Sequence, residues 1–240
     1  MAKSFPNTGA TVIDTSADLP AASSALEGVM MFQKDTNELK ICDGASWISM
    51  LDTDSPPGLT LISPTSVAGT GVTNNGGNIT FSGSSTVSVN GVFNSVFDNY
   101  KFIINITNNT AVGALALRMR NAGTDNSSSN YTYAGLNSYS GSSITSALNS
   151  AGTTTYFVIG IVDNVNYANM PSTFEILQPF LSYRTAYYGF LPNPVNPQSY
   201  FDYMGGAMSV TTSYDGFSVL NASGGTLSGN IRVYGYRNSI

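Results

Sequence analysis

Apolar and polar residues alternate along most of the chain beyond residue 58. The clearest case runs from Tyr100 to Thr107, where every second side chain is aromatic or aliphatic. One set comprises Tyr100, Phe102, Ile104 and Ile106, and the other comprises Lys101, Ile103, Asn105 and Thr107. Because a period of two places successive residues on opposite faces of a strand, we predict a half-buried strand whose first set faces the core.

The same rhythm recurs between clusters of Gly, Asn and Ser, and no stretch keeps a helical period. The candidate strands are Leu59–Ser63, Asn78–Ser82, Thr86–Phe93, Tyr100–Thr107, Ala114–Arg120, Tyr131–Leu136, Thr155–Val162, Thr173–Leu177, Arg184–Phe190, Ala207–Thr212, Gly216–Leu220 and Asn230–Tyr236. About a dozen short strands at this spacing predict an all-β fold, either a sandwich or a barrel.

One run, Tyr156–Val162, is apolar at every position except a glycine. It therefore predicts a central strand that is covered on one face by the core and on the other by a second subunit. Three segments predict loops: 121–130 and 138–153 are long and polar, and 191–198 contains three prolines. Long loops on a rigid sheet are where recognition usually occurs.

The first 58 residues show a different organisation. Three short runs, Val29–Gln33, Leu39–Cys42 and Trp47–Met50, are separated by turn residues and predict a small three-stranded β-meander over 26–52. Residues 1–25 predict an extended segment that is ordered only on docking, and the proline pair within 53–58 predicts a linker to a large domain over 59–240.

The meander is too small to be stable alone, because strands of five residues cannot offset the cost of ordering the chain, roughly 1–2 kcal/mol per residue. It needs a partner. Trp47, the only tryptophan, either fills a local core or anchors a docking surface, and local packing is the better interpretation.

Charge is scarce and unevenly distributed. Only 10% of the residues are charged, and the formal net charge is −5. Residues 1–58 hold eight acids and three lysines, whereas residues 59–240 hold six acids and six bases. The large domain is therefore neutral, which argues against nucleic acid as a partner and favours a glycan or another protein.

Three further features bear on the compartment. The single cysteine cannot form an intrachain disulfide, which fits synthesis in a reducing cytoplasm. The N-terminus lacks the pattern of a signal peptide, and no apolar run approaches the ~18 residues of a membrane span, so we expect no membrane insertion. A surface rich in hydroxyls and amides is typical of an extracellular or virion protein.

The chain lacks the residues of common catalytic sites. Without histidine there is no Ser-His-Asp or Cys-His pair and no histidine metal ligand. A glycan-cleaving enzyme needs two positioned carboxylates, and Glu175 is interpreted as a solvent-facing strand residue. A calcium site shared between loops is an alternative interpretation of the Asp-Asn turns, although no ligand spacing supports it. We expect no enzyme activity, no cofactor and no metal.

A first resemblance is carried by residues of the N-terminal region. They are Leu19-Pro20, Gly28 to Phe32, Asp35 to Leu39, Ile41, Asp43-Gly44 and Trp47. This pattern resembles an element that recurs in tail fibres and other virion appendages of bacteriophages. The resemblance implies an element that attaches to other virion proteins and packs between identical chains.

A second resemblance covers most of the large domain. It rests on Leu61 to Val67, Phe97 to Ile104, Leu117 to Arg120 and Gly229 to Tyr236. These residues are similar to a jelly-roll-like β-domain of phage and cyanophage virion proteins. The resemblance implies a small β-meander followed by a jelly-roll-like antiparallel β-sandwich, in a viral structural protein located in a tail or capsid appendage.

Together these observations predict a homotrimeric phage tail fibre or receptor-binding appendage. We expect Trp47 near the threefold axis and host attachment through tyrosine-bearing loops. Candidate receptor contacts are Tyr139, Tyr187, Tyr188 and Tyr200. A capsid fibre or decoration protein without a receptor role is the first alternative, and a glycan-degrading tailspike is the second.

Overall fold

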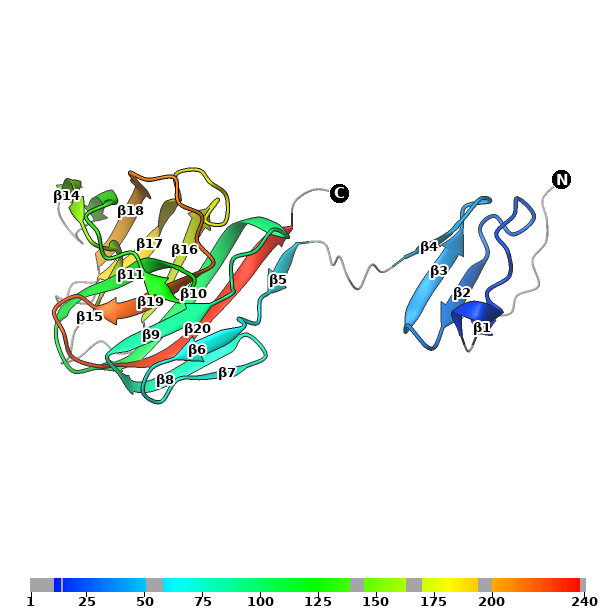
Figure 1. Ribbon diagram of the computed structural model, residues 1–240, viewed down its shortest axis with the longest axis horizontal. Coiled ribbons are helices and arrows are strands. Elements are labelled where there is room, and N and C mark those ends of the chain that lie inside the picture. The colour runs from blue at the N-terminus through cyan, green and yellow to red at the C-terminus, as the bar shows by residue number, and fades with distance from the viewer. Residues whose placement is uncertain are drawn as a thin grey trace. The chain divides into compact units, whose positions relative to one another are not determined.

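The computed structural model describes residues 11–13, 15–50, 58–138, 145–162, 170–193 and 200–237. The chain divides into two compact units, residues 1–57 and 58–240, which we call unit 1 and unit 2 and describe separately (Figure 1). The fold is almost entirely β, and the described residues contain one short 3-10 helix at Ser16–Asp18.

Unit 1 is a four-stranded sheet in the order β1-β2-β3-β4. Its strands are β1 (Thr11–Ile13), β2 (Met30–Gln33), β3 (Glu38–Cys42) and β4 (Trp47–Ser49). The last three form the expected meander, with Asn37 and Gly44 at positive φ in its two turns. Asp43 closes the second turn, since its Oδ1 accepts bonds from the backbone N–H groups of Ala45 and Ser46, and these bonds lower the pKa of its carboxyl.

The expectation for residues 1–25 is wrong where the structure describes them. Strand β1 pairs in parallel with β2, and the following segment covers one face of the sheet. The indole Nε1 of Trp47 donates to the carbonyl of Pro20 at 2.7 Å, and the Cys42 Sγ lies 3.8 Å from the carbonyl of Ser23. These contacts within one chain order the segment without a docking partner.

Unit 2 contains two antiparallel sheets. The strands are β5 (Leu59–Leu61), β6 (Ser66–Ala68), β7 (Thr73–Asn75), β8 (Asn78–Ser84), β9 (Thr86–Asn90), β10 (Phe97–Asn109), β11 (Gly113–Asn121), β12 (Thr124–Asp125), β13 (Tyr131–Ser138), β14 (Thr145–Thr154), β15 (Phe157–Val162), β16 (Met170–Leu177), β17 (Ala186–Asn193), β18 (Tyr200–Met208), β19 (Gly216–Asn221) and β20 (Leu227–Arg237). Ten of them form one sheet and six form the other.

Eight of these strands form a jelly roll. The ten-stranded sheet contains the order β8-β20-β10-β16, and the six-stranded sheet contains β9-β19-β11-β15. Among these eight strands, taken in chain order, every connection crosses between the sheets except the one from β11 to β15, which is the double Greek key of a jelly roll. The predicted jelly-roll-like sandwich is confirmed.

Two hairpin insertions enlarge the ten-stranded sheet beyond β16. Strands β17 and β18 follow β16 directly, and β13 with β14 comes from the connection between β11 and β15. The two insertions meet because β13 pairs with β18 along its whole length. The outcome is a continuous surface in which β14-β13-β18-β17 extends the jelly-roll sheet (Figure 1).

The core lies between the two sheets and follows the predicted alternation. Tyr100, Phe102 and Ile104 are fully buried and Ile106 nearly so. The Phe102 ring stacks on Phe174 of its own sheet at 4.8 Å and meets Phe217 of the opposite sheet edge-on at 5.0 Å. Such aromatic contacts across the interior hold the layers in register.

The expectation for the apolar run 156–162 is wrong. Strand β15 lies at the edge of the six-stranded sheet and is hydrogen-bonded only to β11 within the described residues. Phe157 and Ile159 are nevertheless fully buried, because the inserted strands cover β15 from the other side. The Phe157 ring lies 4.9 Å from Tyr131 and 4.4 Å from Tyr187. No second subunit is needed to bury this strand.

Other predicted boundaries also changed. Much of the expected loop 138–153 is strand β14, and the expected strand Ala207–Thr212 is the end of β18 followed by bends. The first residues of the proline-rich segment 191–198 belong to β17, and its remainder lies outside the described residues, as does most of the expected linker. Polar and glycine-rich strands such as β14 carry no alternation for sequence analysis to detect.

Candidate ligand-binding surface

The outer face of the ten-stranded sheet carries two parallel rows of side chains that run across its strands. The strand register brings each row together from six strands. Row one consists of Leu136, Tyr203, Phe190, Thr173, Ile103 and Arg232. Row two consists of Ala134, Gly205, Tyr188, Glu175, Lys101 and Tyr234. Both rows face away from the core because they alternate with buried neighbours.

Row one exposes large apolar side chains. Phe190 is 61% exposed, Tyr203 is 45% exposed and Leu136 is 49% exposed. The Phe190 and Tyr203 rings lie 5.1 Å apart at an interplanar angle of 58°. Strand pairing holds these rings in position on the sheet. Exposure of large apolar rings to water is unfavourable, so a group of them on one surface is typical of a recognition site.

Row two places a carboxylate beside these rings. Glu175 accepts hydrogen bonds from the hydroxyl of Tyr188, at 2.6 Å, and from the hydroxyl of Tyr236. The bond to Glu175 raises the pKa of Tyr188, and burial followed by the same carboxylate raises the pKa of Tyr236. Both phenols therefore stay protonated at neutral pH and fix the orientation of the carboxylate.

These side chains enclose a hollow of about 440 Å³ on the sheet surface. It is lined by Lys101, Thr173, Phe174, Glu175, Tyr188, Gly189, Phe190 and Tyr203. Its volume lies in the range of small-molecule sites, and its composition, mostly apolar with a few polar groups, is typical of them. A ligand there can stack on a ring face while Lys101 donates to it and the oxygens of Glu175 and Thr173 accept, since the Thr173 hydroxyl already donates to the carbonyl of Phe102.

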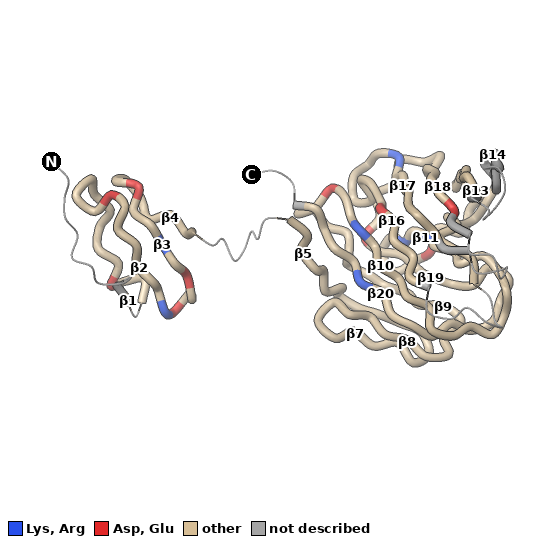
Figure 2. The backbone as a smooth tube through the Cα atoms, turned by 180° about the vertical axis from the view of Figure 1, so that it is seen from behind, with Lys and Arg blue, Asp and Glu red and all other residues tan. Residues whose placement is uncertain are grey.

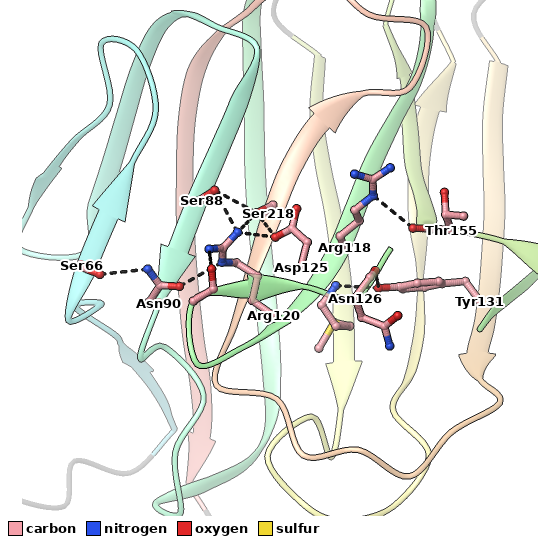
Figure 3. A network of polar contacts seen from close by, with 12 residues as sticks. Ser66, Ser88, Asn90, Arg118, Arg120, Asp125, Asn126, Tyr131, Thr155 and Ser218 are labelled. Carbon is pink, nitrogen blue, oxygen red and sulfur yellow. Dashed lines mark hydrogen bonds and ion pairs between the residues drawn. The ribbon is translucent and has the colours of Figure 1, made fainter. Parts of the chain in front are cut away.

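The outer face of the six-stranded sheet is chemically different. Arg120, whose side chain is only 11% exposed, donates to Asn90 at 3.0 Å and to Ser218 at 2.9 Å, and it forms an ion pair with Asp125 (Figure 3). Ser218 also donates to Asp125 at 2.8 Å. This network joins β12 to the sheet, and its polar groups bind one another, so little remains for a ligand.

The hollow includes only one of the four predicted receptor contacts. Tyr188 lines it, whereas Tyr187 is 2% exposed and donates its hydroxyl to the carbonyl of Val158, so Tyr187 is a core residue and that prediction is wrong. The side chain of Tyr200 and all of Tyr139 lie outside the described residues. Trp47 packs within unit 1, and a contact with another copy stays a prediction.

Sequence analysis missed Phe190, Tyr203, Glu175 and Lys101 as parts of one site. A signal for Phe190 was present in β17, where Tyr188 and Phe190 alternate with Tyr187 and Leu191. That period of two predicts that adjacent tyrosines face opposite sides. Tyr203 could not be found in this way, because its position depends on which strand pairs with β17.

The described residues lack two other kinds of site. They contain no group of three or more His, Cys, Asp or Glu side chains arranged to hold a metal ion. Within the same residues, no helix has the length and hydropathy needed to cross a membrane.

Searches of protein-family models, curated proteins and solved structures found no match to the chain.

Proposed function

We propose that this chain is a non-enzymatic phage virion appendage protein, a tail fibre or receptor-binding protein, that binds a host-surface glycan in the hollow of the ten-stranded sheet. The observation that carries the binding role is the pair of exposed rings, Phe190 and Tyr203, beside the oriented carboxylate of Glu175. The virion role rests on the resemblance of residues 19–47 and 61–236 to phage appendage proteins.

A sugar fits the chemistry of the hollow. A pyranose ring has an apolar C–H face that can lie on an aromatic ring, and its hydroxyls at the rim can donate to a carboxylate and accept from an ammonium group. Charge supports an uncharged ligand, because unit 2 has equal numbers of acids and bases and few charged positions along its strands (Figure 2). Binding should therefore depend little on salt.

The number of carboxylates in the hollow favours binding of a glycan over its cleavage. Glycosidases of the common type place two carboxyl groups roughly 5–10 Å apart, on either side of the scissile bond. Glu175 is the only acid among the residues that line the hollow, and its two oxygens are already engaged by tyrosine hydroxyls. Weak binding at each site would be strengthened by several copies on one particle, by roughly 10²–10⁴.

A double substitution tests the proposal. Phe190→Ala with Tyr203→Ala removes the stacking surface, and we expect at least a tenfold loss of binding to host polysaccharide, measured by calorimetry or on a glycan array. Tyr183→Ala is the matched control, because Tyr183 is 63% exposed but lies outside the hollow. Both side chains of the double variant are exposed, so the fold should be retained.

Two results would contradict the receptor role. One is unchanged polysaccharide binding by the double variant. The other is no binding of the wild-type protein to any polysaccharide or surface extract of its host, which would leave a capsid fibre or decoration protein as the better assignment.

A further inference from the structure

The sheet of unit 1 has one covered and one uncovered face. On the covered face, Met31, Gln33 and Cys42 are buried beneath the segment that follows β1. They are the only buried side chains among the described residues of unit 1. A unit with so few buried residues gains little from apolar burial compared with the cost of ordering its chain.

The other face is entirely apolar. The pairings of Val12 with Phe32, of Phe32 with Leu39, of Met30 with Ile41 and of Ile41 with Ile48 place six residues on it. We call these residues, Val12, Met30, Phe32, Leu39, Ile41 and Ile48, the uncovered face. None of the six is buried, and Val12, Met30 and Ile48 are 54%, 45% and 49% exposed.

We propose that the uncovered face is a self-association surface, on which a second copy of this chain places the same six residues. This inference concerns unit 1 and stands whether or not unit 2 binds a glycan. It differs from the expected contact through Trp47, because Trp47 and its partner Cys42 lie on the covered face. It also gives the expected homo-oligomer a contact surface on this chain.

The area fits an association of identical faces. The uncovered face exposes roughly 400 Å² of apolar surface per chain, which is the size of the largest apolar patch on a typical protein, and such patches are often functional. Since about 65% of the area in homodimer interfaces is apolar, two such faces correspond to an interface of roughly 1,200 Å² in total. That value is within the range of specific protein interfaces.

The charge distribution also fits a second copy. Unit 1 carries more acids than bases, but the strand acids and bases that the structure describes, Glu38 and Lys40, lie on the covered face and pair with each other at 3.2 Å. Two uncovered faces can therefore meet without repulsion between like charges. A strongly charged partner would find no opposite charge on this face.

A charge-swap experiment on the full chain tests this proposal. Met30 is chosen because it is exposed and lies on β2, an inner strand of the sheet. We expect the 25.2 kDa wild-type chain to form dimers or trimers at micromolar concentration in light scattering. Met30→Asp and Met30→Lys should each increase the dissociation constant at least a hundredfold, because like charges would meet in the interface.

Mixing the two variants distinguishes a second copy from other occupants. If the same face binds itself, an equimolar mixture of Met30→Asp and Met30→Lys should recover association that neither shows alone. Val112→Asp, at a residue of unit 2 that is 44% exposed, should leave the oligomer intact. The emission of Trp47, the only tryptophan, shows whether unit 1 stays folded in each variant.

Three results would overturn the proposal. A wild-type chain that is monomeric up to about 100 µM would assign the face to unit 2 of the same chain or to another protein, since an interface of this size is normally stable at that concentration. Oligomers that persist in both single variants would place the interface elsewhere. A mixture that stays monomeric while each variant keeps the wild-type Trp47 emission would exclude contact between identical faces.

Discussion

The two outer faces of the jelly roll use polar side chains in opposite ways. On the six-stranded sheet, Arg120, Asp125 and Ser218 satisfy one another and leave few groups for a ligand. On the ten-stranded sheet, Glu175 is held by two tyrosines, and the rings of Phe190 and Tyr203 beside it remain exposed. We propose on this contrast that the first face serves stability and the second recognition. The predictions below test that division.

The largest expected effect is a loss of folding stability at alkaline pH, and it should depend on the buried Tyr187 much more than on its exposed neighbour Tyr188. Burial raises the pKa of Tyr100 to about 12 and raises the pKa values of Tyr131 and Tyr187 further. In the unfolded chain these phenols titrate near pH 10. Above pH 10 the folded state therefore keeps protons that the unfolded state releases. The contribution of these tyrosines to the free energy of unfolding is fully present below pH 10 and is lost as the pH rises toward their folded-state pKa values.

The free energy of unfolding should fall by about 1.4 kcal/mol per pH unit for each buried tyrosine, or by roughly 4 kcal/mol per pH unit for the three together. Urea denaturation between pH 8 and 11.5 measures it. Tyr187→Phe should reduce the slope by about a third, whereas Tyr188→Phe, at a residue that is 39% exposed, should change it much less. A free energy of unfolding that is constant up to pH 11 would show that the core tyrosines are solvated.

A smaller loss of stability is expected from Arg120→Ala. The substitution leaves Asp125 and Ser218 without their cationic partner in a site that is mostly shielded from water, and we expect a cost of about 3 kcal/mol. Chemical denaturation measures the cost, and binding to the polysaccharide should stay unchanged in the folded fraction. Arg232→Ala, on the exposed end of row one, is the control and should cost less than about 0.5 kcal/mol.

If Arg120→Ala weakened ligand binding by as much as the Phe190 and Tyr203 double variant, the division between the two faces would be wrong. In that case the six-stranded sheet would also take part in recognition.

The smallest effect is expected from Glu175→Gln. The amide keeps one oxygen to accept from Tyr188 or Tyr236 but removes the charge, so we expect a stability change below about 1 kcal/mol and a fall in binding of roughly two- to tenfold. Calorimetry with the polysaccharide measures it, with Tyr183→Ala again as control. Complete loss of a polysaccharide-cleaving activity in this variant would instead point to a catalytic carboxylate.

Local patterns in the sequence determined several features of this protein. The period of two from Tyr100 to Thr107 was sufficient to place four side chains in the core, because alternate residues of a strand must face opposite sides. The absence of histidine by itself excluded the common hydrolase triads, whatever the fold. The low charge of residues 59–240 and their abundant tyrosines predict a neutral partner and aromatic recognition, and this stays a prediction.

Only the tertiary structure decided how the candidate site is assembled. Leu136 meets Tyr203 because β13 pairs with β18, about 70 residues later in the chain, and Tyr236 reaches Glu175 across β10. Likewise β15, which looked like a central strand, is an edge strand that the inserted hairpins cover. A strand's alternation specifies which side is buried but not which strand lies next to it, since pairing depends on contacts between residues far apart in the sequence.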